Sequence, residues 1–303
     1  MEDPRRGAHD SGMQVSIPSR PMGLGILFPG FCGMVVAAVV LAQGRFPNPF
    51  LAALPFALVG FVAWILARWA DRNLENRFWV HILGSFLLVF VVYTALSGVA
   101  PWLLPADREW TLLSVDHVWF GYSWEGWWGK GYSPWVGDFL EAVYGTFYFF
   151  PVFLTGILVW KKDREGIFGT LDRLVLTLLL VFCGYLLVPA RSPYGFMEYP
   201  GLIPSDGIQI RFHQIIVDQP WTKRDCFPSG HVLLSAYAAW LCWLRARPWA
   251  WLMGPWAVLT VVGTLYLRYH FLVDVVVSLL LLPILAVLAN FLFGRMGASP
   301  RSS

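Results

Sequence analysis

The residues with the clearest chemical potential lie near the end of the chain, in the run Arg268-Tyr269-His270-Phe271-Leu272-Val273-Asp274. His270 and Asp274 are four residues apart, so on a helix their side chains would share one face, one turn apart. A carboxylate there can accept the imidazole N–H, which fixes the tautomer and leaves the other ring nitrogen as a nucleophile. Arg268, just before His270, could hold an anionic phosphate. Taken alone, the run would equally suit a structural His–Asp pair.

A second run with chemical potential, Pro228-Ser229-Gly230-His231, opens an apolar segment. Proline suits the first turn of a helix, where its missing N–H costs nothing. Ser229 and Gly230 would then offer a hydroxyl and free backbone N–H groups at the positive end of a helix, which favours an anion. His231 follows in the same turn and could protonate a leaving oxygen. The alternative is an ordinary helix start with a capping serine.

The elements that position these residues are predicted to be membrane helices. The chain has 303 residues, of which 57% are hydrophobic and only 14% charged, and its mean hydropathy is +0.58. The charge content is well below the quarter or so that is usual in soluble domains. The 17 tryptophans are typical of a protein with two membrane–water interfaces. A net charge of +3 gives no indication of a nucleic-acid partner.

Eight apolar segments approach the roughly 20 residues that a membrane-spanning helix needs. We therefore expect an all-α, polytopic membrane helical bundle of about eight transmembrane helices. The chain shows no internal repeat, and we treat it as one domain. The expected spans are 24–43, 51–69, 79–103, 138–160, 167–189, 229–245, 249–267 and 271–293.

Lysine and arginine in the short connections predict the orientation of the bundle, because basic loops stay on the cytoplasmic side. With eight spans, the basic connections after the second, fourth and sixth spans share one side with both basic tails. Both termini are therefore expected in the cytoplasm. The runs that contain Arg191, His231 and His270 then meet on the opposite face, at the depth of lipid headgroups. Two histidines and two arginines at that depth indicate chemistry on a lipid phosphate.

Two long segments, 104–137 and 190–228, are expected on that same outer side. The first is rich in tryptophan and is expected to form an interfacial aromatic belt, with substrate gating as the alternative. Within the second, residues 207–217 alternate apolar positions around Arg211 and His213. They could form an amphipathic flap over the site or a plain surface segment. Three of the four cysteines, Cys32, Cys183 and Cys242, lie in apolar runs and are expected to serve packing.

The motifs together resemble those of the type-2 phosphatidic acid phosphatase superfamily, which also contains vanadium haloperoxidases and several lipid head-group transferases. Its pattern has three parts: Lys, six residues, then Arg-Pro; Pro-Ser-Gly-His; and Ser-Arg, five residues, His, three residues, Asp. The middle part is complete at Pro228–His231, and the last is present as His270 and Asp274. Its arginine is displaced, because Thr264 occupies the expected position and Arg268 is the nearest arginine. That compact form looks more like the sphingomyelin synthase and inositolphosphoceramide synthase branch.

The first part of the family pattern is the poorest match. Arg191 is separated from Pro193 by one residue, and Gly184 stands where the family has lysine. Lys223 or Arg224, just before the middle motif, could supply the missing cation.

The resemblance implies a six-helix core at 78–294, with two additional helices at 23–77 and cytoplasmic tails at 1–22 and 295–303. It implies a covalent mechanism in which His270, oriented by Asp274, attacks phosphorus. His231 would protonate the leaving alkoxide and then activate water or an alcohol. No metal or cofactor is expected, because cations and a helix end would stabilise the charge. The residues implied in phosphate binding are Arg191, Ser229, Gly230 and Arg268, with Lys223 or Arg224 as the additional cation.

Several functions remain open on the sequence alone. The leading one is a lipid-phosphate phosphatase acting on phosphatidic acid, phosphatidylglycerol phosphate or an isoprenyl pyrophosphate. The runner-up is a lipid head-group phosphotransferase, in which an alcohol replaces water. A different class is an intramembrane serine hydrolase using Ser229 and His270, and a further one is a transporter or scaffold that only binds. The positive-inside pattern favours a bacterial inner membrane with the site on the extracytoplasmic face. The particular lipid and the oligomeric state are not encoded in these motifs.

Overall fold

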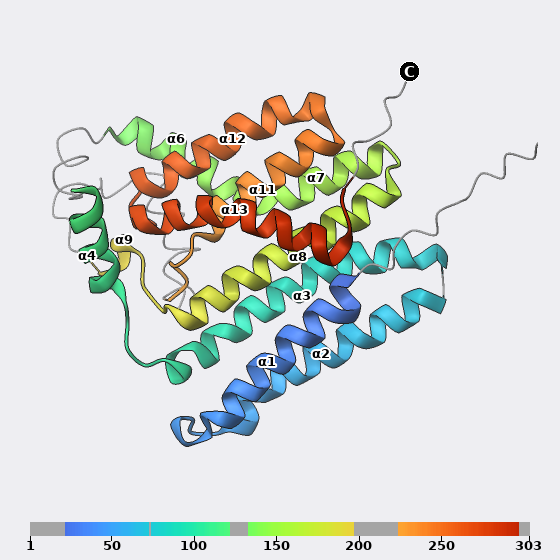
Figure 1. The fold of residues 1–303 in the computed structure, drawn as a ribbon, viewed down its shortest axis with the longest axis horizontal. Helices are drawn as coiled ribbons and strands as arrows, with labels where there is room; N and C mark the ends of the chain where they lie inside the picture. The colour runs from blue at the N-terminus through green and yellow to red at the C-terminus, as the bar shows by residue number, and fades with distance from the viewer. Residues whose placement is uncertain (1–21, 73, 122–132, 197–223, 297–303) are drawn as a thin grey trace, which may run out of the picture.

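The computed structural model describes residues 22–72, 74–121, 133–196 and 224–296, and the regular structure within them is helical (Figure 1). The long helices run roughly side by side and form one bundle. The elements are η1 (Gly23–Leu27), α1 (Phe28–Leu41), η2 (Gln43–Arg45), α2 (Pro49–Arg72), α3 (Leu74–Leu103), α4 (Glu109–Phe120), α6 (Pro134–Gly145), η3 (Thr146–Tyr148), α7 (Phe149–Trp160), α8 (Arg164–Leu187), α9 (Pro193–Phe196), α11 (Gly230–Arg245), α12 (Arg247–Tyr266) and α13 (Leu272–Phe293).

Each of the eight expected spans coincides with helix, and seven of the described segments are long and apolar enough to cross a membrane. This confirms the all-α polytopic bundle. The exception to the expected count is α11, which has 16 residues and is shorter than a full span. Its start is delayed because Ser229 has an extended backbone as the N-cap residue, so the helix begins only at Gly230. The seven candidate spans are Gly23–Leu41, Pro49–Arg72, Arg77–Leu103, Pro134–Trp160, Arg164–Leu187, Arg247–Tyr266 and Leu272–Phe293.

Although α11 is short, it runs from one end of the bundle toward the other. It packs against α7, α8, α12 and α13. At its last turn, Arg245 forms a buried ion pair with Asp163, which lies between α7 and α8, and the Arg245 Nε to Asp163 Oδ2 distance is 2.8 Å. Lys161 Nζ donates to the carbonyl of Arg245 at 2.7 Å. A helix that is enclosed by protein does not need the full length that lipid-facing helices need.

The first two helices, α1 and α2, pack against each other and against α3 along one side of the bundle (Figure 1). The start of η1, which leads into α1, is bound to α8. There the carboxylate of Asp172 accepts hydrogen bonds from the backbone N–H groups of Met22 at 2.9 Å and Gly23 at 2.7 Å. The division between these helices and a six-helix core stays a prediction.

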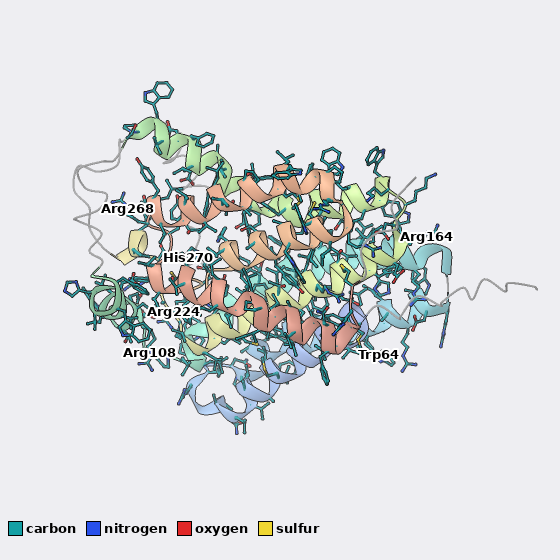
Figure 2. All side chains as sticks on the ribbon, turned by 45° about the horizontal axis from the view of Figure 1, so that its top comes forward. Trp64, Arg108, Arg164, Arg224, Arg268 and His270 are labelled. Carbon is teal, nitrogen blue, oxygen red and sulfur yellow. The ribbon has the colours of Figure 1, made fainter. Side chains whose placement is uncertain are left out.

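The chemically interesting residues gather at one end of the bundle. Figure 2 shows Arg268, His270 and Arg224 toward that end and Arg164 at the opposite one. The loop before α13, the start of α11 and the outer helix α4 meet there, and α4 contacts α13. The three separated sequence runs are thus brought together by the way in which the helices are bundled.

Candidate active site

The His270–Asp274 pair lies at the N-terminal end of α13. Helix α13 begins at Leu272, so His270 precedes the helix instead of lying on it. The two side chains still meet, with 3.4 Å between His270 Nδ1 and Asp274 Oδ2. The same carboxylate oxygen accepts the backbone N–H of Phe271 at 3.0 Å. Asp274 therefore orients the imidazole and caps the first turn of its own helix, and the expected pairing of the two residues holds in a slightly different backbone setting.

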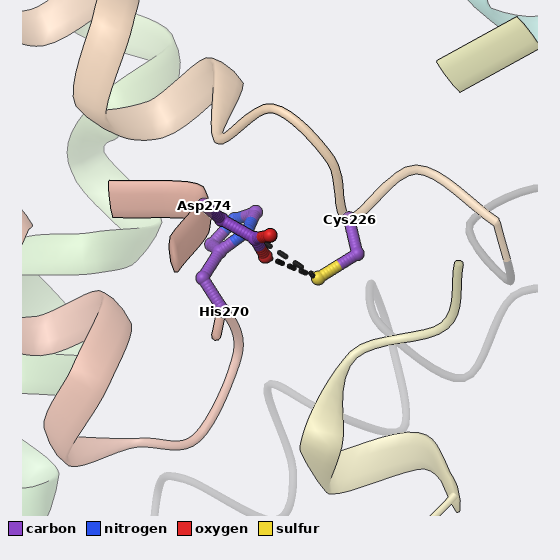
Figure 3. A group of neighbouring side chains, drawn as sticks. All are labelled: Cys226, His270 and Asp274. Atoms are coloured by element: carbon purple, nitrogen blue, oxygen red, sulfur yellow. Dashed lines mark hydrogen bonds and ion pairs between the residues drawn. The ribbon is translucent and has the colours of Figure 1, made fainter. Parts of the chain in front are cut away.

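Cys226 joins this pair as a third buried member (Figure 3). Its Sγ donates to Asp274 Oδ2 at 2.9 Å and lies 3.5 Å from His270 Nδ1. Burial raises the pKa of the Cys226 thiol well above its usual value, so the thiol keeps its proton and can act as the donor. This role could not be predicted from the sequence, because Cys226 belongs to none of the recognised motifs.

The same three residues have the donor types that a metal such as zinc prefers. Their potential ligand atoms all lie within 4.8 Å of one another, and they are the one such group found among the described residues. A thiolate, an imidazole and a carboxylate would suit Zn²⁺, but Cys226 Sγ and His270 Nδ1 would first have to give up the protons that they now direct toward Asp274. The arrangement present is a hydrogen-bonded cluster.

His231 lies in the first turn of α11 and faces His270. The two ring centroids are 5.7 Å apart. The Tyr144 hydroxyl lies 3.2 Å from His231 Nδ1, and the two rings stack at a centroid distance of 4.2 Å. The ring of Phe147 packs against the same imidazole, with 4.1 Å between the two ring centroids. His231 Nε2 is buried and has no hydrogen-bond partner among the described residues, so it is the ring nitrogen left for a substrate.

The start of α11 is built as expected from the Pro-Ser-Gly-His run. The Ser229 hydroxyl accepts the backbone N–H of Val232 at 3.3 Å as the N-cap. A Cβ at Gly230 would lie 2.9 Å from the Tyr185 hydroxyl oxygen, so a glycine keeps the backbone open beside His231. Gly184 is also explained by packing, because a Cβ there would overlap the ring of Pro228. A lysine at the family position is therefore excluded by this close approach of α8 to the loop.

Arg268 is held in the loop that leads into His270. Its side chain is buried, and its backbone has a φ of 65°, in the left-handed region that non-glycine residues seldom adopt. Two contacts from other elements hold this loop. The Arg268 carbonyl accepts the N–H of Tyr194 at 2.9 Å, and the Tyr269 hydroxyl donates to both carboxylate oxygens of Glu141 at 2.9 and 2.7 Å. Arg268 thus lies at the site end of the bundle, close to His270 in the chain (Figure 2).

The other candidate cations are directed elsewhere in this structure. Arg191 Nε donates to Glu109 Oε1 at 2.6 Å, and this hydrogen bond raises the pKa of the guanidinium. Arg224 Nη2 lies 2.9 Å from Asp107 Oδ1, and Arg224 Nη1 donates to the carbonyl of Leu104. Both arginines therefore bind the segment that leads into α4. Lys223 and the expected flap at 207–217 lie outside the described residues.

Helix α4 contributes a residue that sequence reasoning missed. Asp116 is fully buried and accepts two backbone hydrogen bonds from the first turn of α13, from Leu272 N–H at 2.8 Å and Val273 N–H at 2.7 Å. Burial raises the pKa of Asp116 to about 6, although the two hydrogen bonds act in the opposite direction. Asp116 therefore ties the outer helix α4 to the turn that carries Asp274. In the sequence, the one feature that could have drawn attention to Asp116 is that it is a carboxylate within the tryptophan-rich segment 104–137.

The two histidines open onto one cavity of about 290 Å³. Asp225, Cys226, Gly230 and Ser192 line the same end of it. From there the cavity continues between α3, α7, α8 and α11, where its walls are mainly aliphatic and aromatic side chains. The His270–Asp274 end of the site, His231 and an apolar chamber thus share one space, as is common for sites that bind amphipathic ligands.

Comparison with known proteins gives one match. A family model described as the PAP2 superfamily matches residues 110–288, which is more than half of the chain. The matched range runs from α4 into α13 and contains His231, His270 and Asp274. It does not separate the branches of the superfamily, so the likeness to sphingomyelin synthases stays a prediction. No curated protein and no solved structure matches the chain.

Proposed function

Because this chain belongs to the PAP2 superfamily, we propose that it is a membrane phosphatase that releases phosphate from a lipid phosphate through a phosphohistidine on His270. The superfamily and the span-capable helices together support a phosphatase or phosphotransferase in a membrane. The observation that carries the finer proposal is the pairing of His270 with Asp274 at 3.4 Å, opposite a second histidine whose ring is 5.7 Å away.

In the proposed first step, His270 Nε2 attacks phosphorus and the bond from phosphorus to the ester oxygen breaks. The Nδ1 proton stays on His270 and is held by the Asp274 carboxylate, which stabilises the positive charge that forms on the ring. Cys226 donates to the same carboxylate oxygen and keeps it in place. His231 Nε2 gives its proton to the leaving alkoxide, so that the lipid alcohol departs neutral.

In the second step, water replaces the alcohol in the space beside phosphorus. His231 Nε2, now without its proton, accepts a proton from the water as the oxygen attacks. The bond from His270 Nε2 to phosphorus breaks, which frees inorganic phosphate and restores both histidines. The Tyr144 hydroxyl beside His231 Nδ1 supports this exchange, because it holds the ring in one orientation through both steps.

The negative charge of the phosphoryl group would be met by Arg268 and by the start of α11, where Ser229 and the Gly230 amide lie. A helix N-terminus presents free N–H groups and a partial positive charge to an anion. Arg191 could join if it exchanged Glu109 for the phosphate, since its side chain is 43% exposed. Lys223 and Arg224 remain candidates for the additional cation in this proposal.

The setting supports a lipid substrate. The site lies at one end of the bundle, and the cavity that leaves it runs between helices with apolar walls. A phosphate can therefore bind at headgroup depth while the hydrocarbon part stays in an apolar space. The basic loops lie at the end of the bundle opposite the site, and basic loops favour the cytoplasmic side. The end that carries the site is therefore proposed to be extracytoplasmic, with both termini in the cytoplasm of a bacterial cell.

The test is phosphate release by the purified protein from a panel of lipid phosphates in EDTA, with His270→Ala, His231→Ala and the exposed-site control His117→Ala. We expect release by the wild type and by His117→Ala, and loss of about 10³-fold or more in both site variants. A phosphoenzyme that is stable in base and labile in acid should form in wild type and His231→Ala but not in His270→Ala. Release that persists in His270→Ala would refute the phosphohistidine.

The runner-up is transfer of the phosphoryl group to an alcohol, which shares the first step. Arg268 close before His270 is the observation that favours it. In the same assay, product that forms only when a lipid or polyol acceptor is added would replace the phosphatase by the transferase. The site residues would remain the same in both cases.

A further inference from the structure

The cavity beside the two histidines extends deep into the bundle, well beyond the space that a phosphate needs. On α8 its lining runs from Tyr185 to Leu171, which is about 20 Å of helix at 1.5 Å per residue. This is roughly two thirds of the hydrocarbon thickness of a bilayer. The walls along this length are apolar and include Phe86, Val89 and Phe90 of α3, Leu174 and Leu178 of α8, and Leu234 of α11.

The volume of this cavity limits what it can hold. At roughly 30 Å³ per water-sized group, about 290 Å³ accommodates on the order of ten such groups. That is the scale of one hydrocarbon chain. The cavity is also continuous with the site, because His231 and His270 form part of its lining. A chain bound there would be attached to a phosphate at His270.

Asp225 is the carboxylate that faces this cavity at its site end. The Tyr93 hydroxyl donates to Asp225 Oδ2 at 2.5 Å, and Tyr144, Tyr148 and Tyr185 interact with Asp225 electrostatically. Among the described residues, no lysine or arginine forms an ion pair with it. The groups that face it are therefore tyrosine hydroxyls and His270, whose charge would stabilise the carboxylate. Burial raises the pKa of Asp225 to about 6, and the hydrogen bond from the Tyr93 hydroxyl shows Asp225 Oδ2 acting as an acceptor.

The Asp225 carboxylate accepts the Tyr93 hydroxyl and retains further lone pairs beside the cavity, and lone pairs can only accept hydrogen bonds. A ligand group beside it must therefore be a donor. An ester carbonyl in that place would put one acceptor against another, which costs free energy in a desolvated site. The group next to the phosphate ester of a bound lipid is thus expected to be a hydroxyl or an ammonium.

We propose that this cavity binds one hydrocarbon chain of the lipid phosphate and that Asp225 accepts a hydrogen bond from a hydroxyl or ammonium group next to the phosphate ester. Asp225 is then the specificity residue of the site, and lipid phosphates with such a donor are the preferred substrates. This inference rests on the proposed function, since it describes the substrate of the same two histidines.

The first test compares two substrates that differ in one group: an oleoyl lysophosphatidate and its analogue without the 2-hydroxyl. We expect wild type to favour the hydroxyl-bearing lipid in kcat/KM by about tenfold to a hundredfold, the range for a hydrogen bond to a charged group. In Asp225→Ala the ratio between the two lipids should fall toward one. The ratio is independent of the amount of folded protein, so partial misfolding does not imitate this result.

A 2-amino analogue then distinguishes the two donors. If the amino lipid exceeds the hydroxyl lipid in kcat/KM for wild type but not for Asp225→Ala, the natural donor is an ammonium. If the hydroxyl lipid leads, it is a hydroxyl. If wild type has nearly the same kcat/KM for the hydroxyl lipid, the amino lipid and the lipid without a donor, the assignment of Asp225 is overturned.

The second test blocks the chain. Val89→Trp fills the cavity from α3, whereas Leu87→Trp places the same ring on the exposed face of that helix, where Leu87 is 63% exposed. We expect Val89→Trp to lower kcat/KM for the oleoyl lipid about tenfold or more relative to an octanoyl lipid, and Leu87→Trp to keep the wild-type ratio. If the oleoyl-to-octanoyl ratio of kcat/KM is the same in wild type, Val89→Trp and Leu87→Trp, the cavity does not bind the hydrocarbon chain. No phosphate release from any lipid by wild type refutes the proposed function itself, which is a different result from release without discrimination.

Discussion

Replacing Asp116 tests whether the outer helix α4 positions the proposed catalytic pair, His270 and Asp274. The Asp116 carboxylate accepts the N–H groups of Leu272 and Val273 at 2.8 and 2.7 Å, and these residues form the first turn of α13. His270 immediately precedes that turn, and Asp274 lies within it. Asp116→Ala removes both acceptors and leaves two N–H groups in a buried place. Asp116→Asn keeps the shape and one carbonyl oxygen.

The size of the effect follows from these contacts. A hydrogen bond to a charged group contributes about 1.5–3 kcal/mol, so two give roughly 3–6 kcal/mol before any opposing cost. The cost of burying the carboxylate opposes this gain, and it is large enough to raise the pKa of Asp116 to about 6. We therefore expect Asp116→Ala to lower the free energy of unfolding by about 2–3 kcal/mol, and Asp116→Asn by about half of that.

The effect on catalysis should be a loss in kcat. A displacement of the reacting groups by about 1 Å can cost on the order of a hundredfold in rate, so kcat of Asp116→Ala should fall about tenfold to a hundredfold. The assay is steady-state phosphate release, together with thermal unfolding in detergent. His117→Ala, an exposed change at the next position of α4, is the control. If Asp116→Ala unfolds earlier but keeps the wild-type kcat and KM, α4 is only a structural clamp and the positioning role is refuted.

Three further predictions concern the cluster, the opposite end of the bundle and pH. Cys226→Ala removes the donor to Asp274 and should lower kcat about two- to tenfold, whereas Cys226→Ser should keep most of it; equal loss in both would contradict a donor role. Arg245→Met leaves the partly buried Asp163 without its ion-pair partner and should lower the free energy of unfolding by up to about 3 kcal/mol, the lower end for a fully buried pair, measured by denaturant or thermal unfolding, with no change in KM of the folded fraction. Burial raises the pKa of Asp116 from 3.8 to about 6 in the folded protein, which favours the protonated form there, so the free energy of unfolding should fall as pH rises from 3.8 to about 6. Asp116→Asn should lose that part of the pH dependence, and an unchanged profile would contradict the shift.

The sequence was sufficient for the helices, and it brought the two histidines forward as a candidate site that stays a prediction. A helix in a membrane satisfies its own backbone groups, so each span can be recognised from one continuous apolar run. Basic connections and the positions of the His231 and His270 runs then placed the chemical groups at one end of the bundle. The resemblance of these runs to a known pattern agreed with the PAP2 match over residues 110–288. The departure was the number of spans, because the 229–245 segment forms α11 as expected but is shorter than a full span.

The tertiary structure decided which residues surround the two histidines. The contacts that build these surroundings join residues that are remote in the chain. Cys226 meets Asp274 across 48 positions, Tyr93 meets Asp225 across 132, and Asp116 meets Val273 across 157. No local periodicity encodes such contacts, since they depend on how separate helices pack. The same packing explains why Gly184 cannot carry the family lysine, as its Cα faces the ring of Pro228. The sequence therefore determined which candidate residues the site contains, and the packing of the bundle determined which groups contact them and which cavity they line.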